Sequence, residues 1–333
     1  MTYSLPRQLS SLLLATSILL WSCESFAPRP PPQRKVIVTG AAGRTGKLVF
    51  SSLLKQANFY PMGLVKSEKS AKKIIKDNAE CGLENVWICD VTKLDSDNEG
   101  SLPNGIRGSD AMIICTSAVP KLRKRHLAKA LLKAPINMLA GKKPLDFKTL
   151  QFYFAPGQHP EKVDYEGQIA QIDLAKKLGV SHVVLVSSMG GTNPDDFLNT
   201  LGKDKDGNGD GDILVWKRKA ERYLVESGLQ YTIIHPGHLK DTPGGLSELW
   251  LDVDDNIMMS PSHHMMSRCD VARLCVASLK VSGGQSSSFD CINIDVPEGT
   301  KSRPTEIALI EFLDAETTYD YSTDRKLDYS MNI

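Results

Sequence analysis

The sequence lacks several features that would point to other classes of protein. Neither sign of charge is in excess: 40 Lys and Arg stand against 39 Asp and Glu, for a formal net charge of +1. Bulk electrostatics therefore gives no case for nucleic acid as a partner. The seven cysteines form no CxxC pair and no zinc spacing, and the histidines are few and loosely arranged, so we predict no metal site. With 333 residues, 41% of them hydrophobic, the chain can form one large domain with a substantial core.

No apolar run near the N-terminus is long enough for a comfortable membrane span. Arg7 precedes the apolar stretch Leu12–Trp21 and the small residues Ser22 and Cys23, which is the order of a secretory signal peptide. We therefore predict a signal peptide over residues 1–25 and a mature form without a stable membrane span. Phe26-Ala27-Pro28 and the acid-free segment after it, residues 26–34 in all, resemble the second part of a presequence for plastids of secondary endosymbiotic origin. The predicted location is the plastid (chloroplast), reached through the secretory route, and the alternative is the secretory pathway or the ER.

Three glycines spaced three apart follow a short β-branched run. The run is Lys35–Thr39, and the glycines are Gly40, Gly43 and Gly46. A strand that turns sharply into a helix directs backbone N–H groups and the positive helix end at one point, which suits a pyrophosphate. A helix is predicted over Lys47–Gln56, and a second strand follows. This βαβ context predicts a dinucleotide site whose loop also includes Ala42, Arg44 and Thr45.

The end of the second predicted strand indicates which dinucleotide binds. Sites selective for NAD usually have an acidic residue about 20 residues beyond the glycines to hold the ribose 2′-hydroxyl. Lys66 is 20 residues past Gly46, and no acid stands there. A lysine at this point, with Ser67 and Arg44, would attract the 2′-phosphate of NADP. We predict NADP (NADPH) as the cofactor; the alternative is that Lys66 is an exposed cation at a strand end.

Apolar runs alternate with helical patterns along the rest of the chain. This alternation predicts an α/β fold: one doubly wound, mostly parallel Rossmann sheet flanked by helices, over residues 35–313, with a loosely held tail over 314–333. The predicted strands are Val86–Cys89, Ala111–Cys115, His182–Val186, Tyr231–Ile234 and Phe289–Ile294. The predicted helices are Asp164–Leu178, Trp216–Ser227, Asp270–Leu279 and Thr305–Asp314.

Ligands of such sheets bind beyond the carboxyl ends of the strands. The residues found there are Asp90 and Val91, Thr116 and Ser117, Ser187, and Pro236 and Gly237. Asp90 could accept a hydrogen bond from the adenine amino group or could cap the next turn, and the sequence leaves both open. Thr116 and Ser117 are expected to line the ribose and nicotinamide.

The chain resembles an atypical short-chain dehydrogenase/reductase, in particular a plant and algal group of NADP-binding Rossmann proteins. The resemblance covers about Lys35 to Leu313. The stretches that carry it are 38–46, 116–121, 157–176, 190–194, 213–221, 231–234, Arg268 and 270–272. It implies a catalytic serine after the fifth strand, matched by Ser187 with Ser188 beside it, and a lysine that holds the nicotinamide ribose, matched by Lys217.

The usual catalytic tyrosine is absent. Typical relatives place it four residues before the lysine, where the lysine lowers its pKa so that it can exchange a proton. Ile213 stands four residues before Lys217, and Val215 stands four before Lys219. Tyr165 and Ser188 are possible substitutes. We therefore expect an NADPH-dependent reductase of a small conjugated or quinoid substrate; the alternative is a non-catalytic NADP(H)-sensing protein.

Two insertions interrupt the family pattern. Residues 121–150 place Lys121, Arg123, Lys124, Arg125, Lys129 and Lys133 around leucines, a basic amphipathic pattern that could contact an acidic partner or an anionic membrane surface, or could be a solvated helix. Residues 203–212 are acidic and rich in glycine. Counted from Asp206, they resemble a calcium loop, but Lys217 occupies position twelve, where a glutamate is required. We interpret this segment as an acidic turn.

Overall fold

A computed structural model of the protein describes residues 33–94, 104–139, 141, 144, 150–261, 263–297 and 300–322. The predicted signal peptide, most of the predicted transit segment and residues 323–333 lie outside this part of the chain. A compact unit begins at Arg34. Within the described residues, none of the helices has the length and apolar character needed to cross a membrane.

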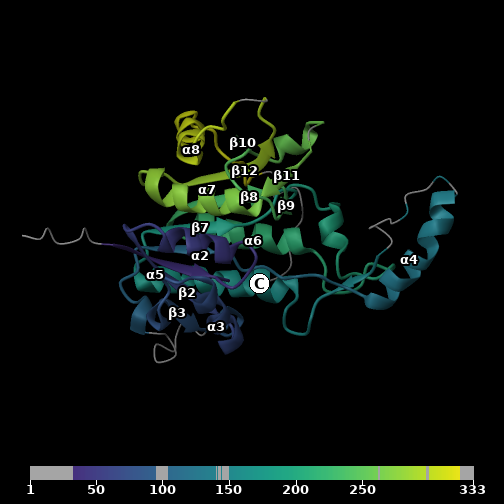
Figure 1. Ribbon diagram of the computed structural model, residues 1–333, viewed down its shortest axis with the longest axis horizontal. Helices are drawn as coiled ribbons and strands as arrows, with labels where there is room; N and C mark the ends of the chain where they lie inside the picture. The colour runs from purple at the N-terminus through teal and green to yellow at the C-terminus, as the bar shows by residue number, and fades with distance from the viewer. Residues whose placement is uncertain are drawn as a thin grey trace, which may run out of the picture. The chain divides into compact units, whose positions relative to one another are not determined.

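An eight-stranded sheet forms the centre of the unit, and Figure 1 shows it with β10 near the top and β3 near the bottom. Neighbouring strands are parallel except for β10, which is antiparallel to β12. In spatial order the strands are β10 (Glu248–Asp252), β12 (Ser287–Ile294), β8 (Gln230–Pro236), β7 (His182–Val186), β4 (Ala111–Ile114), β1 (Arg34–Thr39), β2 (Phe59–Val65) and β3 (Val86–Ile88). The predicted doubly wound sheet is confirmed.

The central strands are apolar on both faces because helices cover both sides of the sheet. In β1, Val36 and Val38 belong to one buried cluster and Ile37 to the other. This is why parallel strands of this kind have continuous apolar runs rather than alternating ones. The same property made these strands easy to recognise in the sequence.

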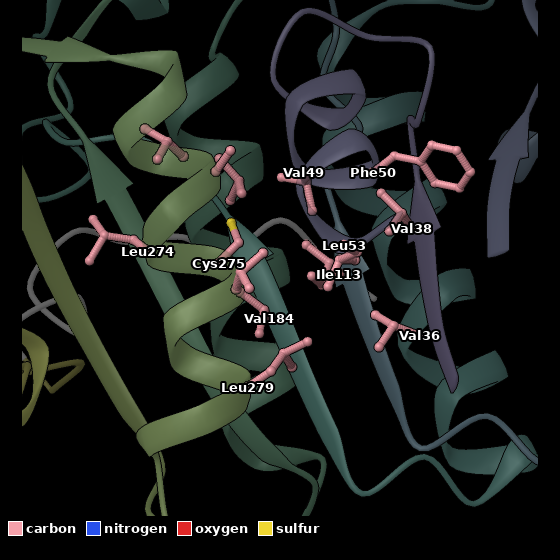
Figure 2. Packing of buried hydrophobic residues seen from close by; sticks show 14 of the residues in the cluster. Val36, Val38, Val49, Phe50, Leu53, Ile113, Val184, Leu274, Cys275 and Leu279 are labelled. Atoms are coloured by element: carbon pink, nitrogen blue, oxygen red, sulfur yellow. The ribbon is translucent and has the colours of Figure 1, made fainter. Parts of the chain in front are cut away.

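One face of the sheet packs against α2, α7 and α8. Figure 2 shows Val49, Phe50 and Leu53 of α2 close to the strands, and Cys275 of α7 close to Val184 of β7. The other face packs against α5 and α6. The helices are α2 (Gly46–Leu54), α3 (Glu68–Asp77), α4 (Lys124–Leu139), α5 (Gly167–Leu178), α6 (Ile213–Glu226), α7 (Arg268–Val281) and α8 (Thr305–Asp314).

Two smaller pairs of strands lie outside the main sheet. β9 (His238–Lys240) and β11 (Met265–Ser267) pair in parallel, and β5 (Lys121–Leu122) pairs antiparallel with β6 (Phe152–Tyr153). The second pair joins the two ends of the basic insertion, whose helix α4 buries none of its residues. The predicted helix Asp164–Leu178 begins earlier, as a π-helical segment over Glu161–Glu166 that leads into α5.

The acidic insertion forms a turn held by its own side chains. A carboxylate oxygen of Asp204 accepts hydrogen bonds from the backbone N–H groups of Asp206 and Asn208, each at 2.9 Å. Lys203 pairs with Asp212 at 2.7 Å. No group of three or more His, Cys, Asp or Glu side chains that could hold a metal ion occurs among the described residues.

The segment after α8 differs from the loosely held tail that the sequence suggested. Its Tyr319 and Tyr321 rings lie 4.8 and 4.1 Å from the guanidinium carbon of Arg218 in α6. The backbone N–H of Asp320 donates to Asp254 at 2.7 Å. Because aromatic rings and a buried guanidinium attract each other, the expectation of a loose tail is wrong for residues up to Ser322.

Candidate cofactor-binding site

The glycine-rich loop between β1 and α2 is built around close backbone contacts. Gly40 has φ of +63°, and a Cβ on it would lie 2.8 Å from the carbonyl oxygen of Cys115. A Cβ on Gly46 would lie 2.2 Å from the carbonyl oxygen of Gly40, and one on Gly43 would lie 2.9 Å from the same atom. The Thr45 side chain makes no capping hydrogen bond at the start of α2. The N–H groups of Lys47 and Leu48 donate to the carbonyl oxygens of Gly43 and Thr45 at 3.1 and 2.9 Å. What α2 offers an anion is therefore the positive end of the helix.

A cavity of about 360 Å³ opens beside this loop, at the carboxyl ends of β1, β2, β3 and β4. It brings together eight of the predicted cofactor residues: Gly40, Ala42, Gly43, Lys66, Asp90, Val91, Thr116 and Ser117. Its other walls include Ser70, Thr92, Lys121 and Gln158, which the sequence reasoning did not assign. The cavity lies at the start of a helix, and the glycines beside it leave no room for a Cβ. Both features fit a bound dinucleotide.

Lys66 lies in the cavity at the end of β2. Its ammonium group donates a hydrogen bond to Oε1 of Gln158 at 2.7 Å. Gln158 is 92 residues further along the chain, so only the fold brings the two together. Ser67 does not line the cavity: its hydroxyl caps α3 by accepting from the N–H of Ser70 at 3.3 Å.

Asp90 caps the next turn, which is one of the two roles that the sequence left open for it. Its Oδ1 accepts from the N–H of Thr92 at 3.2 Å and from the Thr92 hydroxyl at 2.8 Å, which caps the short 3-10 helix Val91–Lys93. The residue also lines the cavity. The cap therefore fixes the carboxylate at the cavity wall.

Arg44 is engaged away from Lys66. Its guanidinium pairs at 2.6 Å with Asp241, which in turn pairs at 2.8 Å with Arg268 at the start of α7. The Arg44 and Asp241 side chains are both largely exposed. Asp241 holds this guanidinium in an exposed pair, and the help of Arg44 at the 2′-phosphate stays a prediction.

Polar side chains from α5 and from the segment before it hold the strand end at Thr116 in place. The amide of Gln168 donates to the carbonyl oxygen of Thr116 at 3.2 Å, and Gln171 bonds to its hydroxyl. The backbone N–H of Ala118 donates to Asp164 at 2.9 Å. Asp164 also pairs with Lys217 at 2.7 Å, and both side chains are buried. Lys217 is therefore part of the support beneath Thr116–Ala118, and it does not line the cavity.

Ser187 is held in a second, buried polar network. Its hydroxyl donates to Glu221 of α6. Nε2 of His235 lies 3.1 Å from the other oxygen of Glu221, while Nδ1 faces Asp290 at 3.5 Å. Burial alone would raise the pKa of Glu221, but His235, Arg218 and the Ser187 hydroxyl outweigh it and lower that pKa to about 2. Burial is likewise the main reason that the pKa of Asp290 rises to about 8.

The other residues proposed for chemistry lie outside the cavity. The Tyr165 ring packs against the tilted ring of Trp216, with the ring centroids 5.5 Å apart. The Ser188 hydroxyl donates to the carbonyl oxygen of Met189. Pro236 is the last residue of β8 and Gly237 follows it, with its N–H donating to the carbonyl oxygen of Cys291 at 3.0 Å. Ile213, four residues before Lys217, is buried in a cluster with Ala118 and Phe154. This side chain therefore contributes packing and has no group that could exchange a proton.

Comparisons with known proteins agree with this geometry. A sequence profile described as NAD(P)H-binding matches residues 146–281. The chain is 38% identical to sanguinarine reductase of Eschscholzia californica over 263 residues, which cover 77% of this chain and 87% of the relative. It is also 38% identical over 266 residues to an uncharacterized chloroplastic protein of Arabidopsis thaliana, with 80% of this chain and 70% of the relative covered.

A solved structure shows the same fold at lower sequence identity. It is a candidate NAD-dependent epimerase/dehydratase from Bacillus halodurans, with a TM-score of 0.57 and 19% identity, covering 84% of this chain and 99% of its own. The extended match to a relative at 38% identity carries more weight, because it spans most of both sequences. The chain belongs to the NAD(P)H-binding family of Rossmann proteins that resemble atypical short-chain dehydrogenases/reductases.

Proposed function

We propose that this protein is an NADPH-dependent reductase of a small conjugated or quinoid acceptor. The observation that carries the choice of NADPH is Lys66, which enters the cavity where NAD-selective proteins have an acid, and which Gln158 orients at 2.7 Å. A lysine can neutralise a 2′-phosphate, whereas it cannot replace an acceptor for a ribose hydroxyl.

Each part of the cavity suits one part of the cofactor. Gly40, Gly43 and the first turn of α2 would bind the pyrophosphate, and Lys66 the 2′-phosphate. Asp90 would accept from the adenine, and Thr116 and Ser117 would line the ribose nearer the nicotinamide. The bound nucleotide supplies the hydride. The Lys217–Asp164 pair positions Thr116–Ala118 through the N–H of Ala118, so Lys217 acts on this site through Asp164.

The class of acceptor follows from the missing acid. Ile213 is buried and apolar, and the Ser187 hydroxyl is already donated to Glu221. A simple ketone needs a proton delivered to its oxygen as hydride arrives. A quinone, flavin or conjugated ring spreads the charge and can take its proton from water. The relative named sanguinarine reductase supports a reductase activity in this family.

The buried Ile213 and the Ser187 hydroxyl that is donated to Glu221 also favour a second candidate, an NADP(H)-sensing protein without turnover. A sensor needs the cavity and Lys66 but no proton donor. Ser187 and Lys217 are both held by buried carboxylates, and a protein that only binds the cofactor does not need either side chain to be free for chemistry.

An acceptor panel separates the two candidates. NADPH oxidation would be followed with a benzoquinone, with FMN and with cyclohexanone as the ketone control. The reductase proposal predicts turnover with a quinone or flavin and none with the ketone. Ketone reduction at a typical rate, about 10 per second, would contradict the role given to the missing tyrosine. Tight NADPH binding without any turnover would favour the sensor.

The substitute acids are tested in the same assay. Tyr165→Phe keeps the ring packed against Trp216 and removes only the hydroxyl. Unchanged turnover would fit a water-derived proton, whereas a large fall in kcat would assign the proton to Tyr165. Ser188→Ala is the parallel test for the second hydroxyl.

We further propose that residues 1–25 are a signal peptide, that residues 26–34 direct import into a plastid, and that residues 35–313 form the NADPH-binding domain. The relative from Arabidopsis is chloroplastic by name, which supports the location. A fluorescent fusion of residues 1–40 in an alga with secondary plastids tests the route. Phe26→Lys should block plastid entry, and import that survives this change would reject the proposed role of Phe26.

A further inference from the structure

Helix α4 exposes an unusual amount of apolar side chain. None of its residues is buried. Leu131, Leu132, Ile136, Met138 and Leu139 are between 56% and 91% exposed. Single exposed apolar residues are ordinary, but a group of five on one helix is typical of a surface that contacts something else.

The charge around α4 is strongly one-sided. Residues 111–145 contain eight Lys or Arg and no Asp or Glu, although the whole chain has a net charge of only +1. In the helix, Arg125, Lys129 and Lys133 follow one another at a spacing of four residues, which places them along one side. Leu127, Leu131 and Met138 recur at helical spacing on the opposite side. Leu132 and Leu139 lie at the border between the two sides, and Ile136 lies among the cations.

We propose that α4 lies along an anionic lipid surface, with the leucine side in the headgroup boundary and the lysine side facing lipid phosphates. An apolar stripe beside a lysine-rich polar face is the pattern of interfacial helices. Protein interfaces are depleted in lysine, so the composition fits lipid better than an acidic protein. The helix has 16 residues, too few to span a bilayer but enough to lie in its surface. This inference does not depend on the reaction proposed above.

Vesicle flotation tests the proposal, using the chain from Gln33 onward. This segment contains the compact unit with its own buried clusters on both faces of the sheet, and it omits the apolar leader. The vesicles would contain phosphatidylcholine with or without 30% phosphatidylglycerol. We expect binding only with phosphatidylglycerol, weakened by added salt.

Two double variants identify the surface. Each lysine removed from an anionic surface weakens binding roughly fivefold. K129E/K133E removes two and should therefore weaken binding by at least about 30-fold. The matched control is K69E/K73E on α3, which has the same spacing, charge change and exposure, and should bind like the wild type. Leu131→Gln should weaken binding even at low salt, because it removes apolar contact without changing charge.

Several outcomes would overturn the proposal. They are no binding to anionic vesicles at low salt, equal loss in both double variants, or no loss in K129E/K133E. Equally tight binding to soluble polyglutamate would indicate an acidic macromolecule instead of lipid. Self-association that K129E/K133E abolishes, without vesicle binding, would indicate a second copy of the chain.

Discussion

Replacing Glu221 with glutamine should destabilise the protein by about 3 kcal/mol at pH 7. The carboxylate is 2% exposed and accepts from Ser187, with His235 Nε2 at 3.1 Å and Arg218 at 3.4 Å. Its pKa falls from 4.5 to about 2 in the folded protein. Each pKa unit is worth about 1.4 kcal/mol, so the difference corresponds to roughly 3 kcal/mol. Loss of one partner of a buried ion pair costs a similar amount, about 3–5 kcal/mol.

Urea unfolding of the wild type and Glu221→Gln at pH 7 measures this difference directly. The matched control is Glu226→Gln on the same helix, whose carboxylate is 70% exposed and 3.9 Å from Arg222; we expect a change below about 0.5 kcal/mol. Because the folded pKa of Glu221 is depressed, its contribution is present above about pH 4.5 and is lost as the pH falls toward 2. A Glu221→Gln variant within 1 kcal/mol of the wild type at pH 7 would refute this reasoning.

Three further changes probe other parts of the structure. Gly46→Ala should lower both stability and cofactor affinity, because the new Cβ would lie 2.2 Å from a carbonyl oxygen. Gly191→Ala is the control and should be tolerated, because the nearest atom to its Cβ is a side-chain carbon at 3.7 Å. Thermal melts measure the stability of both variants, and calorimetry measures their cofactor affinity. Asp290, with a pKa raised to about 8, should make stability fall as the pH rises from 4 to 8, and Asp290→Asn should flatten that slope in urea titrations. Burial raises the pKa of the Cys115 thiol to about 12. At pH 8 an alkylating reagent should therefore label Cys115 far more slowly than a free thiol, as measured by mass spectrometry of the labelled peptides. Rapid labelling would show that the thiol is accessible.

Local patterns in the sequence predicted the framework of the fold closely. The strand His182–Val186 and the helix Thr305–Asp314 have the predicted bounds. Apolar runs and helical spacing are properties of neighbouring residues, so they can be recognised without the fold. The glycine loop belongs to the same class, because its close contacts are made within one strand–turn–helix unit and with the adjacent strand β4.

Contacts between distant segments could not be predicted in this way. Gln158 orients Lys66 across 92 residues, and Asp241 holds Arg44 across 197. The antiparallel edge strand Glu248–Asp252 is short and follows a glycine-rich loop, and it forms by pairing with β12. Each of these depends on the folded topology, which the local pattern does not contain.

Calorimetric titration of NADPH and NADH tests the central claim most directly. We predict that NADPH binds about 10–150-fold more tightly, because one charge-assisted contact from Lys66 contributes roughly 1.5–3 kcal/mol. Lys66→Asp should reverse the preference, while Lys73→Asp, on an exposed side of α3 and outside the cavity, should preserve it. Gln158→Leu should reduce the preference by releasing Lys66. Equal affinities for the two cofactors in the wild type, or tighter binding of NADH, would contradict the account.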